Sequence, residues 1–458
     1  MSRYLFDHRL ILEFFLIGSL TLAGSTAWAT NLEDVYVASK SHDPVLGAAR
    51  ADYAATQQIV PQARSQLLPN VAFGAQTNWN EREFVNSGLE QEFNDNSWQA
   101  QLRQPIVNLE RWYTYTSSKA SVESARLGFS ATEQDLIVRA INAYLDVLRA
   151  EALVEAARAA EDAVERQLEQ VTQRFDVGLV AITDVLEAQA EYDNSVVNRV
   201  QAVGDHDIFF EVLRTLAGRP YDEIDFLSES LPVIDPEPSD EEEWVRVALQ
   251  TNYSVLAAEF QLAASNRTVR ARRSGHLPTV DATITESSFT TGGQSFLGSE
   301  IDQTVYGLSV TLPIYQGGFT SSRTKEAQFL AERSRQLLAD SRLTVGRDIR
   351  NLFRRVATDV VRVRARLKGI ASSESALDAT QTGYDVGTRN IVDVLDAQNR
   401  LFSSQFDYAD SRYNYVRSLI ALKQQAGTLN EADLLDLNTY TDPAVPVKRL
   451  ASLKLRSD

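Results

Sequence analysis

The chain has 458 residues, of which 45 are lysine or arginine and 62 are aspartate or glutamate, giving a net charge of -17. This balance argues against a nucleic-acid partner, because binding to nucleic acid depends on neutralising phosphates. The chain contains no cysteine, which excludes thiolate chemistry, disulfides and a lipid anchor on an N-terminal cysteine.

Residues 1–29 have the pattern of a secretory signal peptide. Arg3 and Arg9 accompany a mostly apolar run, and positions 27–29 are Ala-Trp-Ala, a small-x-small cleavage pattern. An uncleaved anchor helix is the alternative, but Glu13 interrupts the run and a span needs about 20 apolar residues. No later stretch is long and apolar enough for a transmembrane helix, so any membrane span would have to use strands.

The rest of the chain is an internal duplication. Residues 175–189 recur 209 residues later as residues 384–398, and nine of the 15 positions are identical. We expect each repeat to contain a helix, two β-strands and a helical hairpin. The resulting organisation is a first repeat at 30–218, an acidic linker or equatorial segment at 219–243, a second repeat at 244–428, and a C-terminal equatorial segment and tail at 429–458.

In each repeat, two short segments alternate between apolar and polar residues. They are residues 71–79 and 98–103 in the first repeat, and residues 280–285 and 306–312 in the second. Segments of about ten residues with one apolar and one polar face are typical of transmembrane β-strands. A soluble hairpin with one wetted face fits this pattern equally well, so the pattern alone leaves both open.

A tract without proline follows the strands in each repeat. All twelve prolines lie outside residues 106–219 and 314–442, so continuous helix is allowed through both tracts. Apolar residues recur at steps of three and four through residues 345–370, the period of an amphipathic helix. Each tract contains a Val-Gly pair, at Gly178 or Gly387, where glycine can adopt the left-handed conformation that ends a helix. We therefore predict two helical hairpins with arms up to roughly 100 Å long, at 1.5 Å per residue.

The segment between the repeats, residues 219–243, is acidic. It holds ten acidic residues against one basic residue, together with four prolines. We expect a linker or a belt around the helical rods, with some order around Ile224 to Leu227.

Four strands are too few to close a barrel. An open sheet edge cannot face lipid, because its backbone N–H and C=O groups would stay unpaired. Two chains would supply eight strands, whose interior is filled by side chains, whereas three chains supply twelve and leave a lumen. The strands therefore favour a trimer whose rods continue the barrel as a helical tube.

Four runs of the sequence closely resemble the TolC-type outer-membrane efflux and secretion channels, the outer membrane factor family. The runs are residues 178–184 in the first hairpin, 312–318 after the fourth strand, 384–397 in the second hairpin and 426–431 near the end. The similarity extends from Asn31 to about Asn438. It implies a mixed fold, in which a trimeric 12-stranded transmembrane β-barrel with four strands per protomer is continued by a long α-helical coiled-coil tunnel in the periplasm.

The resemblance also implies a function. The protein would be the channel-tunnel of a tripartite export system in the cell outer membrane, passing drugs, secreted proteins or both from an inner-membrane pump to the exterior. The implied partners are a homotrimer of the chain, a periplasmic adaptor (membrane fusion) protein, an inner-membrane RND or ABC-type exporter, and outer-membrane lipid. No cofactor is expected. A soluble periplasmic coiled-coil adaptor or structural rod is the alternative; it shares the hairpins but has no need of lipid-facing strands in both repeats.

Asp393 and Asp396 are candidates for a selectivity ring. They are three residues apart and therefore lie on one face of a helix. In a trimer, six carboxylates would surround the narrow end of the tube, and such rings select cations. The alternative is that acids in the first turn of a helix complement its dipole.

The resemblance implies a gate latch built from Gln167, Asp184, Tyr384 and Arg389. An Arg–carboxylate bond, with hydrogen bonds from the tyrosine and the glutamine, would hold the inner hairpin against its neighbours. Solvated polar residues on long helices are the alternative reading. The two turn glycines named above, Gly178 and Gly387, mark candidate docking points for the adaptor, although a plain turn role explains them equally well.

Catalysis finds little support in the sequence. His42, His206 and His276 lie far apart, without the spacing of metal ligands. Neither a Walker loop nor a Gly-x-Ser-x-Gly elbow occurs. We therefore expect a protein that is not an enzyme and holds no metal.

Overall fold

The two halves of the chain fold into the same series of elements in the computed structural model, which describes residues 30–293 and 299–450. The segment interpreted as a signal peptide, residues 1–29, lies outside the described residues, as does the tail from residue 451. The first half contains α1 (Leu32–His42), α2 (Pro44–Gln57), α3 (Ile59–Ser65), β1 (Asn70–Phe84), β2 (Leu89–Val107), α4 (Leu109–Asp176) and α5 (Ile182–Ala217). The second half contains α6 (Glu241–Thr251), α7 (Tyr253–Arg273), the 3-10 helix η1 (Ser274–His276), β4 (Thr279–Thr291), β5 (Ser299–Thr311), α8 (Phe319–Asp385) and α9 (Ile391–Ala426).

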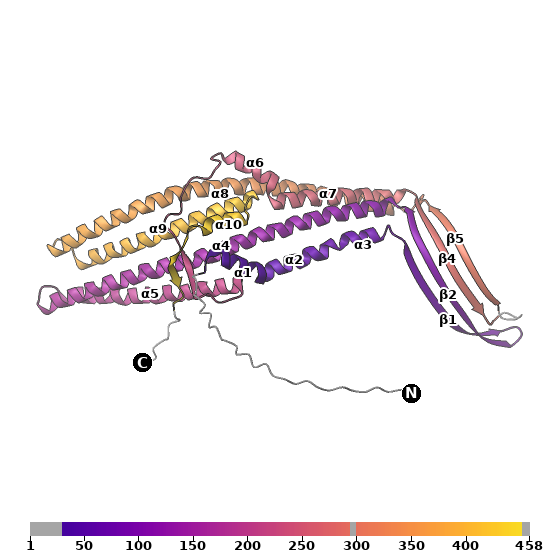
Figure 1. The fold of residues 1–458 in the computed structure, drawn as a ribbon, viewed down its shortest axis with the longest axis horizontal. Coiled ribbons are helices and arrows are strands. Elements are labelled where there is room, and N and C mark those ends of the chain that lie inside the picture. Colours follow the sequence, from indigo (N-terminus) through magenta and orange to yellow (C-terminus); the bar gives the residue numbers. More distant parts are fainter. Residues whose placement is uncertain (1–29, 294–298, 451–458) are drawn as a thin grey trace, which may run out of the picture.

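The helical hairpins predicted from the proline-free tracts form the body of the molecule. The rods α4 and α8 have 68 and 67 residues, so each is roughly 100 Å long. The shorter arms α5 and α9 have 36 residues each and end at Gly218 and Gly427, both with φ of 74°. Figure 1 shows the two hairpins side by side, with their turns at one end of the molecule and a β-sheet at the other.

The sheet contains four antiparallel strands in the order β1-β2-β4-β5. The four alternating segments of the sequence lie almost wholly within these strands, which are longer than predicted. β2 pairs with β4 across the two repeats, and their register is fixed by pairs such as Ala100 with Glu286. The strands β1 and β5 form the two sides of this sheet and pair with one neighbour each.

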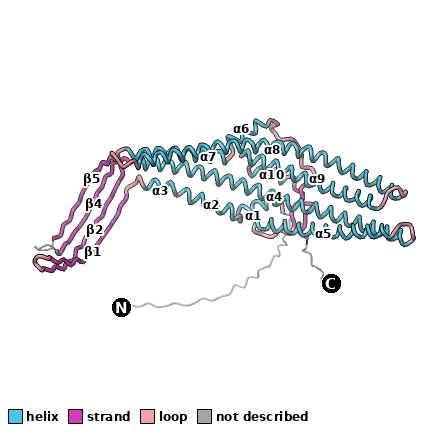
Figure 2. The backbone as a smooth tube through the Cα atoms, turned by 180° about the vertical axis from the view of Figure 1, so that it is seen from behind, coloured by secondary structure: helices cyan, strands magenta, loops and turns pink. Residues whose placement is uncertain are grey.

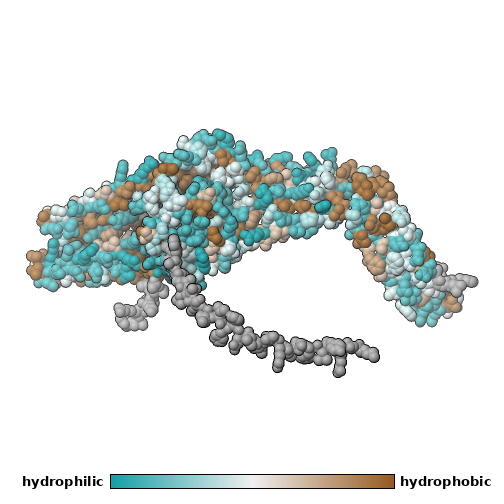
Figure 3. Space-filling model, in the orientation of Figure 1, coloured by the Kyte–Doolittle hydropathy of each residue, from teal (hydrophilic) through white to brown (hydrophobic). Residues whose placement is uncertain are grey.

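One face of the sheet is apolar. Ile284 lies opposite Tyr306 and Ala282 opposite Leu308 on β4 and β5, and the side chains of Tyr306 and Leu308 are 76% and 71% exposed. The residues between them are Thr283 and Gly307, which face the other side of the sheet, as alternation along a strand requires. Figure 3 shows apolar residues gathered where the sheet joins the rods. An exposed apolar face of this kind marks a surface that is covered in the working protein.

A small equatorial group of elements lies midway along the rods, and Figure 2 shows it from the other side. The strand β3 (Glu223–Leu227) from the acidic segment pairs with β6 (Thr441–Lys448) from the C-terminal segment, beside α10 (Glu431–Asn438). The largest buried cluster lies here and includes Tyr144, Ile224 and Tyr413. The acidic segment is therefore a structured belt for part of its length and also contains the start of α6.

Among the described residues, no helix has an apolar stretch of the length needed to cross a membrane.

Candidate functional site

The turns of the two hairpins have the same geometry. Gly178 and Gly387 each have a φ of 79°, a conformation that glycine adopts without the steric cost of a Cβ atom. The second turn is closed by a hydrogen bond of 2.8 Å from the Thr388 N–H to the Gly383 carbonyl. A Cβ atom at either turn glycine would meet nothing within 4 Å. The backbone conformation therefore requires glycine at both turns, whereas packing within the chain does not.

The helices that leave the turns begin differently in the two repeats. Asn390 caps α9 by accepting from the Asp393 N–H at 2.8 Å, and the Asp393 carboxylate accepts from the Asn390 N–H at 3.4 Å. The equivalent positions 209 residues earlier are Ala181 and Asp184, where the alanine provides no side-chain cap. The second hairpin therefore has a reciprocal cap that fixes the start of its inner arm.

The two candidate ring aspartates lie in the first two turns of α9. The Asp393 carboxylate lies 3.8 Å from the Arg389 guanidinium, and the Asp396 carboxylate lies 3.8 Å from the Arg400 guanidinium. The two residues of each pair are four positions apart in the chain. All four side chains are substantially exposed, so these pairs contribute little stability. Within one chain, Asp393 has the capping role expected of an acid in the first turn, and Asp396 projects from the same side of the helix.

Two of the four candidate latch residues are buried at the junction of the hairpins. Gln167 is 4% exposed and Tyr384 is 8% exposed. Tyr384 belongs to a buried cluster with Val164 and Val171, which lie about one turn on either side of Gln167. The Tyr384 hydroxyl and the Gln167 amide nitrogen are both buried without a hydrogen-bond partner among the described residues. Burying such groups costs free energy unless a partner is found.

The other two latch candidates are not paired with each other within the chain. Arg389 lies beside Asp393, as described above. The Asp184 carboxylate instead accepts from the Thr183 hydroxyl at 3.4 Å. The structure of one chain therefore brings Gln167 and Tyr384 to one junction and leaves Arg389 and Asp184 on separate hairpins.

Arg174, which the sequence reasoning did not select, joins the two hairpin tips. Its guanidinium lies 4.9 Å from the centre of the Tyr384 ring and 3.2 Å from the Asp385 carboxylate. The repeat offers the signal that was missed, because the position 209 residues later is glycine. A Cβ atom at Gly383 would lie 2.8 Å from the Arg389 Cγ atom. The two repeats therefore differ at this position. The first hairpin carries the long side chain of Arg174, and Gly383 on the second hairpin leaves room for the side chain of Arg389.

The equatorial belt contains a buried acid. Asp225 on β3 is 3% exposed, and one oxygen of its carboxylate has no hydrogen-bond partner among the described residues. Burial raises the pKa of Asp225 to about 6, and the negative charges of Asp34, Asp442 and Glu223 add to this shift. The backbone carbonyl of Asp225 accepts from the Tyr144 hydroxyl at 2.5 Å. The belt is therefore tied to α4 at a point where its stability depends on pH.

Within the part of the chain that the structure describes, no three His, Asp or Glu side chains are grouped so as to hold a metal ion.

Known proteins resemble the chain along most of its length. The sequence profile of the family described as "Outer membrane efflux protein" matches residues 35–219 and 244–428, which correspond closely to the two repeats. The chain is 35% identical over 436 residues to the outer membrane protein TolC of Escherichia coli (strain K12), covering 92% of this chain and 87% of that protein.

More distant relatives extend the comparison. The chain is 24% identical over 439 residues to the alkaline protease secretion protein AprF of Pseudomonas aeruginosa, covering 94% of this chain and 91% of that protein. The crystal structure of the outer membrane protein VceC from Vibrio cholerae matches with a TM-score of 0.74 at 16% identity, covering 86% of this chain and 96% of that chain. At that identity, the structural likeness concerns the fold alone.

Proposed function

The chain belongs to the outer membrane efflux protein family, and from this premise we propose how it assembles and with which partners it works. It is an outer-membrane channel for efflux and protein secretion, with a large part in the periplasm. The observation that carries the proposal is the combination, in one chain, of a four-stranded sheet with two singly paired strands and two helical hairpins with rods of roughly 100 Å.

The assembly is a homotrimer with a 12-stranded transmembrane barrel. In lipid, the outer edges of β1 and β5 would leave backbone groups unpaired, at a cost of several kcal/mol each. Pairing β5 of one chain with β1 of the next satisfies both edges, and three chains close the ring. The exposed apolar face that includes Tyr306 and Leu308 then meets lipid, and the rods continue the barrel as a tunnel.

The tunnel is closed at the hairpin tips by the latch and the acidic ring. Three copies of Asp393 and Asp396 surround the axis and favour cations. Arg389 of one chain faces Asp184 of its neighbour, because the two are not paired within a chain. A hydrogen bond from the Gln167 amide to the Tyr384 hydroxyl in the closed tunnel would satisfy both of these buried groups.

The partners are a periplasmic adaptor protein and an inner-membrane exporter of the RND or ABC type. The turns provide the docking points, since apolar side chains surround the turn glycines: Leu179, Val177 and Val386 are 74%, 69% and 69% exposed. Exposed apolar groups at a loop tip are typical of a protein interface. The exported cargo is drugs, secreted proteins or both. The protein has no enzymatic role, since its family is one of channels.

A cysteine scan tests the assembly, because the chain has no native cysteine. Single cysteines along β1 combined with single cysteines along β5 should form disulfides between chains in outer membranes, giving a ladder that stops at three chains. The control is the pair Ala100→Cys and Glu286→Cys on neighbouring interior strands, which should link only within a chain. A ladder that stops at two chains, or β1–β5 disulfides only within a chain, would contradict the trimeric barrel.

A further inference from the structure

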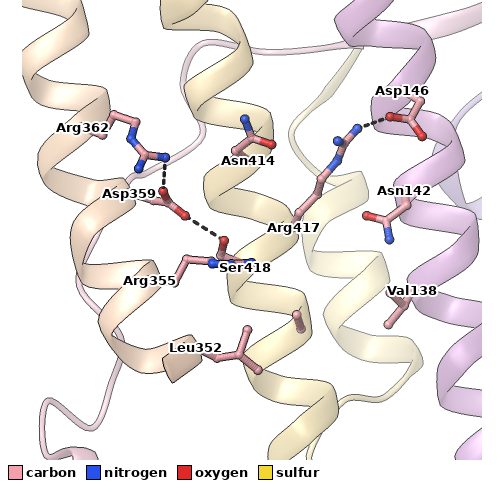
Figure 4. A pocket seen from close by; sticks show the side chains of 11 residues that line it. Val138, Asn142, Asp146, Leu352, Arg355, Asp359, Arg362, Asn414, Arg417 and Ser418 are labelled. Carbon is pink, nitrogen blue, oxygen red and sulfur yellow. Dashed lines mark hydrogen bonds and ion pairs between the residues drawn. The ribbon is translucent and has the colours of Figure 1, made fainter. Parts of the chain in front are cut away.

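A recess opens on the rods between α4, α8 and α9. Its volume is about 650 Å³, within the range of small-molecule binding sites. Figure 4 shows side chains from all three helices that line it: Asn142 and Asp146 from α4, Arg355 and Asp359 from α8, and Arg417 and Ser418 from α9.

The two aspartates of the recess, Asp146 and Asp359, each form an ion pair with an arginine that also lines it. Asp359 is 2% exposed and accepts from the Arg362 guanidinium at 2.8 Å and from the Ser418 hydroxyl at 2.7 Å. Asp146 forms an ion pair with Arg417. Each carboxylate is therefore neutralised by an arginine of the recess, and neither offers a strong site for a cation.

The recess has a net positive charge and contains hydrogen-bond donors that are not used within it. Three arginines, Arg355, Arg362 and Arg417, line it together with two aspartates, which leaves a net charge of +1. Among the lining residues drawn in Figure 4, none forms a hydrogen bond or an ion pair with Arg355 or with the Asn142 amide. The Nε–H of Arg417 is buried and has no hydrogen-bond partner among the described residues. Donors that lack acceptors and surround an open volume favour an anionic guest.

The charge of α8 around the recess contrasts with that of the whole chain. Residues 341–369 contain nine basic and two acidic residues, in a chain whose net charge is -17. Several of these arginines pair with acids on other helices, as Arg342 does with Glu259 and Arg366 with Asp407. The guanidinium of Arg355 projects from the α8 wall of the recess and forms no ion pair with the described residues.

The recess faces away from the equatorial belt. On α4, Tyr144 donates to β3 of the belt, and Asn142 and Asp146 lie about 200° around the helix from it, at 100° per residue. On α9, Tyr415 donates to the linker at 3.0 Å, and Arg417 again lies about 200° away. If the belt surrounds the outside of the tunnel, as the proposed function requires, the recess opens on the lumen. It lies about 36 Å along α9 from Asp393 at the narrow end.

We propose that this recess is a binding site in the channel wall for organic anions that carry carboxylate groups. A carboxylate matches the planar guanidinium of Arg355 through two parallel hydrogen bonds, while the Arg417 Nε–H and the Asn142 amide supply further donors. The site binds an anionic solute inside a channel whose net negative charge otherwise repels anions. This inference rests on the proposed function for its placement in the lumen, although binding itself does not.

The test uses citrate, a tricarboxylate, as the probe with the purified assembled protein. Isothermal titration calorimetry should detect one citrate per chain for the wild type, and Arg355→Gln should weaken binding about tenfold, the effect of losing a charge-assisted pair. Arg364→Gln is the matched control, because Arg364 is another arginine of the same basic stretch of α8 but lies about 180° from Arg355 around the helix. It should bind citrate as the wild type does.

Single-channel recordings then test the placement. Citrate should reduce the current through wild-type and Arg364→Gln channels, and much higher concentrations should be needed for Arg355→Gln. Unchanged citrate binding by Arg355→Gln, or equal losses in both variants, would overturn the inference. Binding that depends on Arg355 without any effect on current would also overturn it, since the recess would then not face the lumen. Failure of the wild type to conduct at all would speak against the proposed function, whereas the calorimetry would still report on the site.

Discussion

Removal of the Arg174 side chain should open the tunnel. The guanidinium holds the tip of the first hairpin to the second by its contact with the Tyr384 ring at 4.9 Å and by its ion pair with Asp385 at 3.2 Å. A cation–π contact at a partly exposed site contributes about 0.5–1 kcal/mol, and an exposed ion pair contributes up to about 1 kcal/mol. The two together amount to roughly 0.5–2 kcal/mol per chain, which corresponds to about a two- to thirtyfold change in an equilibrium constant.

Planar-bilayer recordings of Arg174→Ala provide the assay. The variant should spend a larger share of time at high conductance than the wild type, and the excess should become larger still if the three chains open together. Arg166→Ala is the control, since Arg166 is also exposed on α4 but lies about two turns before Arg174, further from the tip. At 1 M salt, where the Debye length is about 3 Å, part of the effect should persist, because the ring contact is screened less than the ion pair. Equal conductance of Arg174→Ala and the wild type would refute this account of the tip.

The remaining predictions concern the latch, the acidic ring and the belt. The double variant Tyr384→Phe with Arg389→Ser should raise conductance and admit larger solutes while trimers still form; unchanged conductance would remove these residues from the gate. Asp393→Ala with Asp396→Ala should abolish block by a trivalent cation and reduce the preference for cations, so block that survives would place the blocking site elsewhere. Asp225 binds a proton in the folded protein between about pH 4 and 6 that the unfolded chain releases, because its pKa is raised to about 6 from an ordinary value of 3.8. Stability should therefore fall as pH rises through this window, and Asp225→Asn should flatten the fall and gain up to about 3 kcal/mol at pH 7.5; parallel melting curves of the two proteins across that range would contradict it.

The hairpins and the four strands could be predicted because their signals are local. A proline-free tract with a helical period specifies a rod without knowledge of its neighbours, and a glycine with positive φ marks where the rod must turn. The duplication strengthened both signals, since Gly178 and Gly387 hold the same position in the two repeats and have the same φ of 79°.

A belt was one of two structures expected for the acidic segment, but the strand pairing within it could not be predicted from local patterns. Its strands β3 and β6 pair Ile224 with Val447, residues separated by more than 200 positions that share no sequence signal. The composition of the acidic segment indicated a linker or a belt with some order around Ile224 to Leu227, because local composition does not identify a distant partner strand. Pairing between such remote segments depends on the tertiary structure.

The contacts at the hairpin tips could also be predicted only in part, because they depend on how the hairpins pack. The family resemblance pointed to Tyr384 and Arg389, whereas the sequence signal for Arg174 was only its departure from the repeat, and its two contacts lie on the other hairpin. The burial of Gln167 between two valines of α4 that face Tyr384 also depends on how the hairpins pack. The ion pair expected between Arg389 and Asp184 would join different chains, so its geometry belongs to the assembly.

Single-channel recording of the purified wild-type protein in a planar bilayer shows whether this chain forms a channel. We expect discrete current steps with a preference for cations, and a trivalent cation on the side of the hairpin tips should reduce those steps. Protein that has inserted with its strands folded and yet carries no current, under any voltage and with the Arg174→Ala variant equally silent, would contradict this expectation.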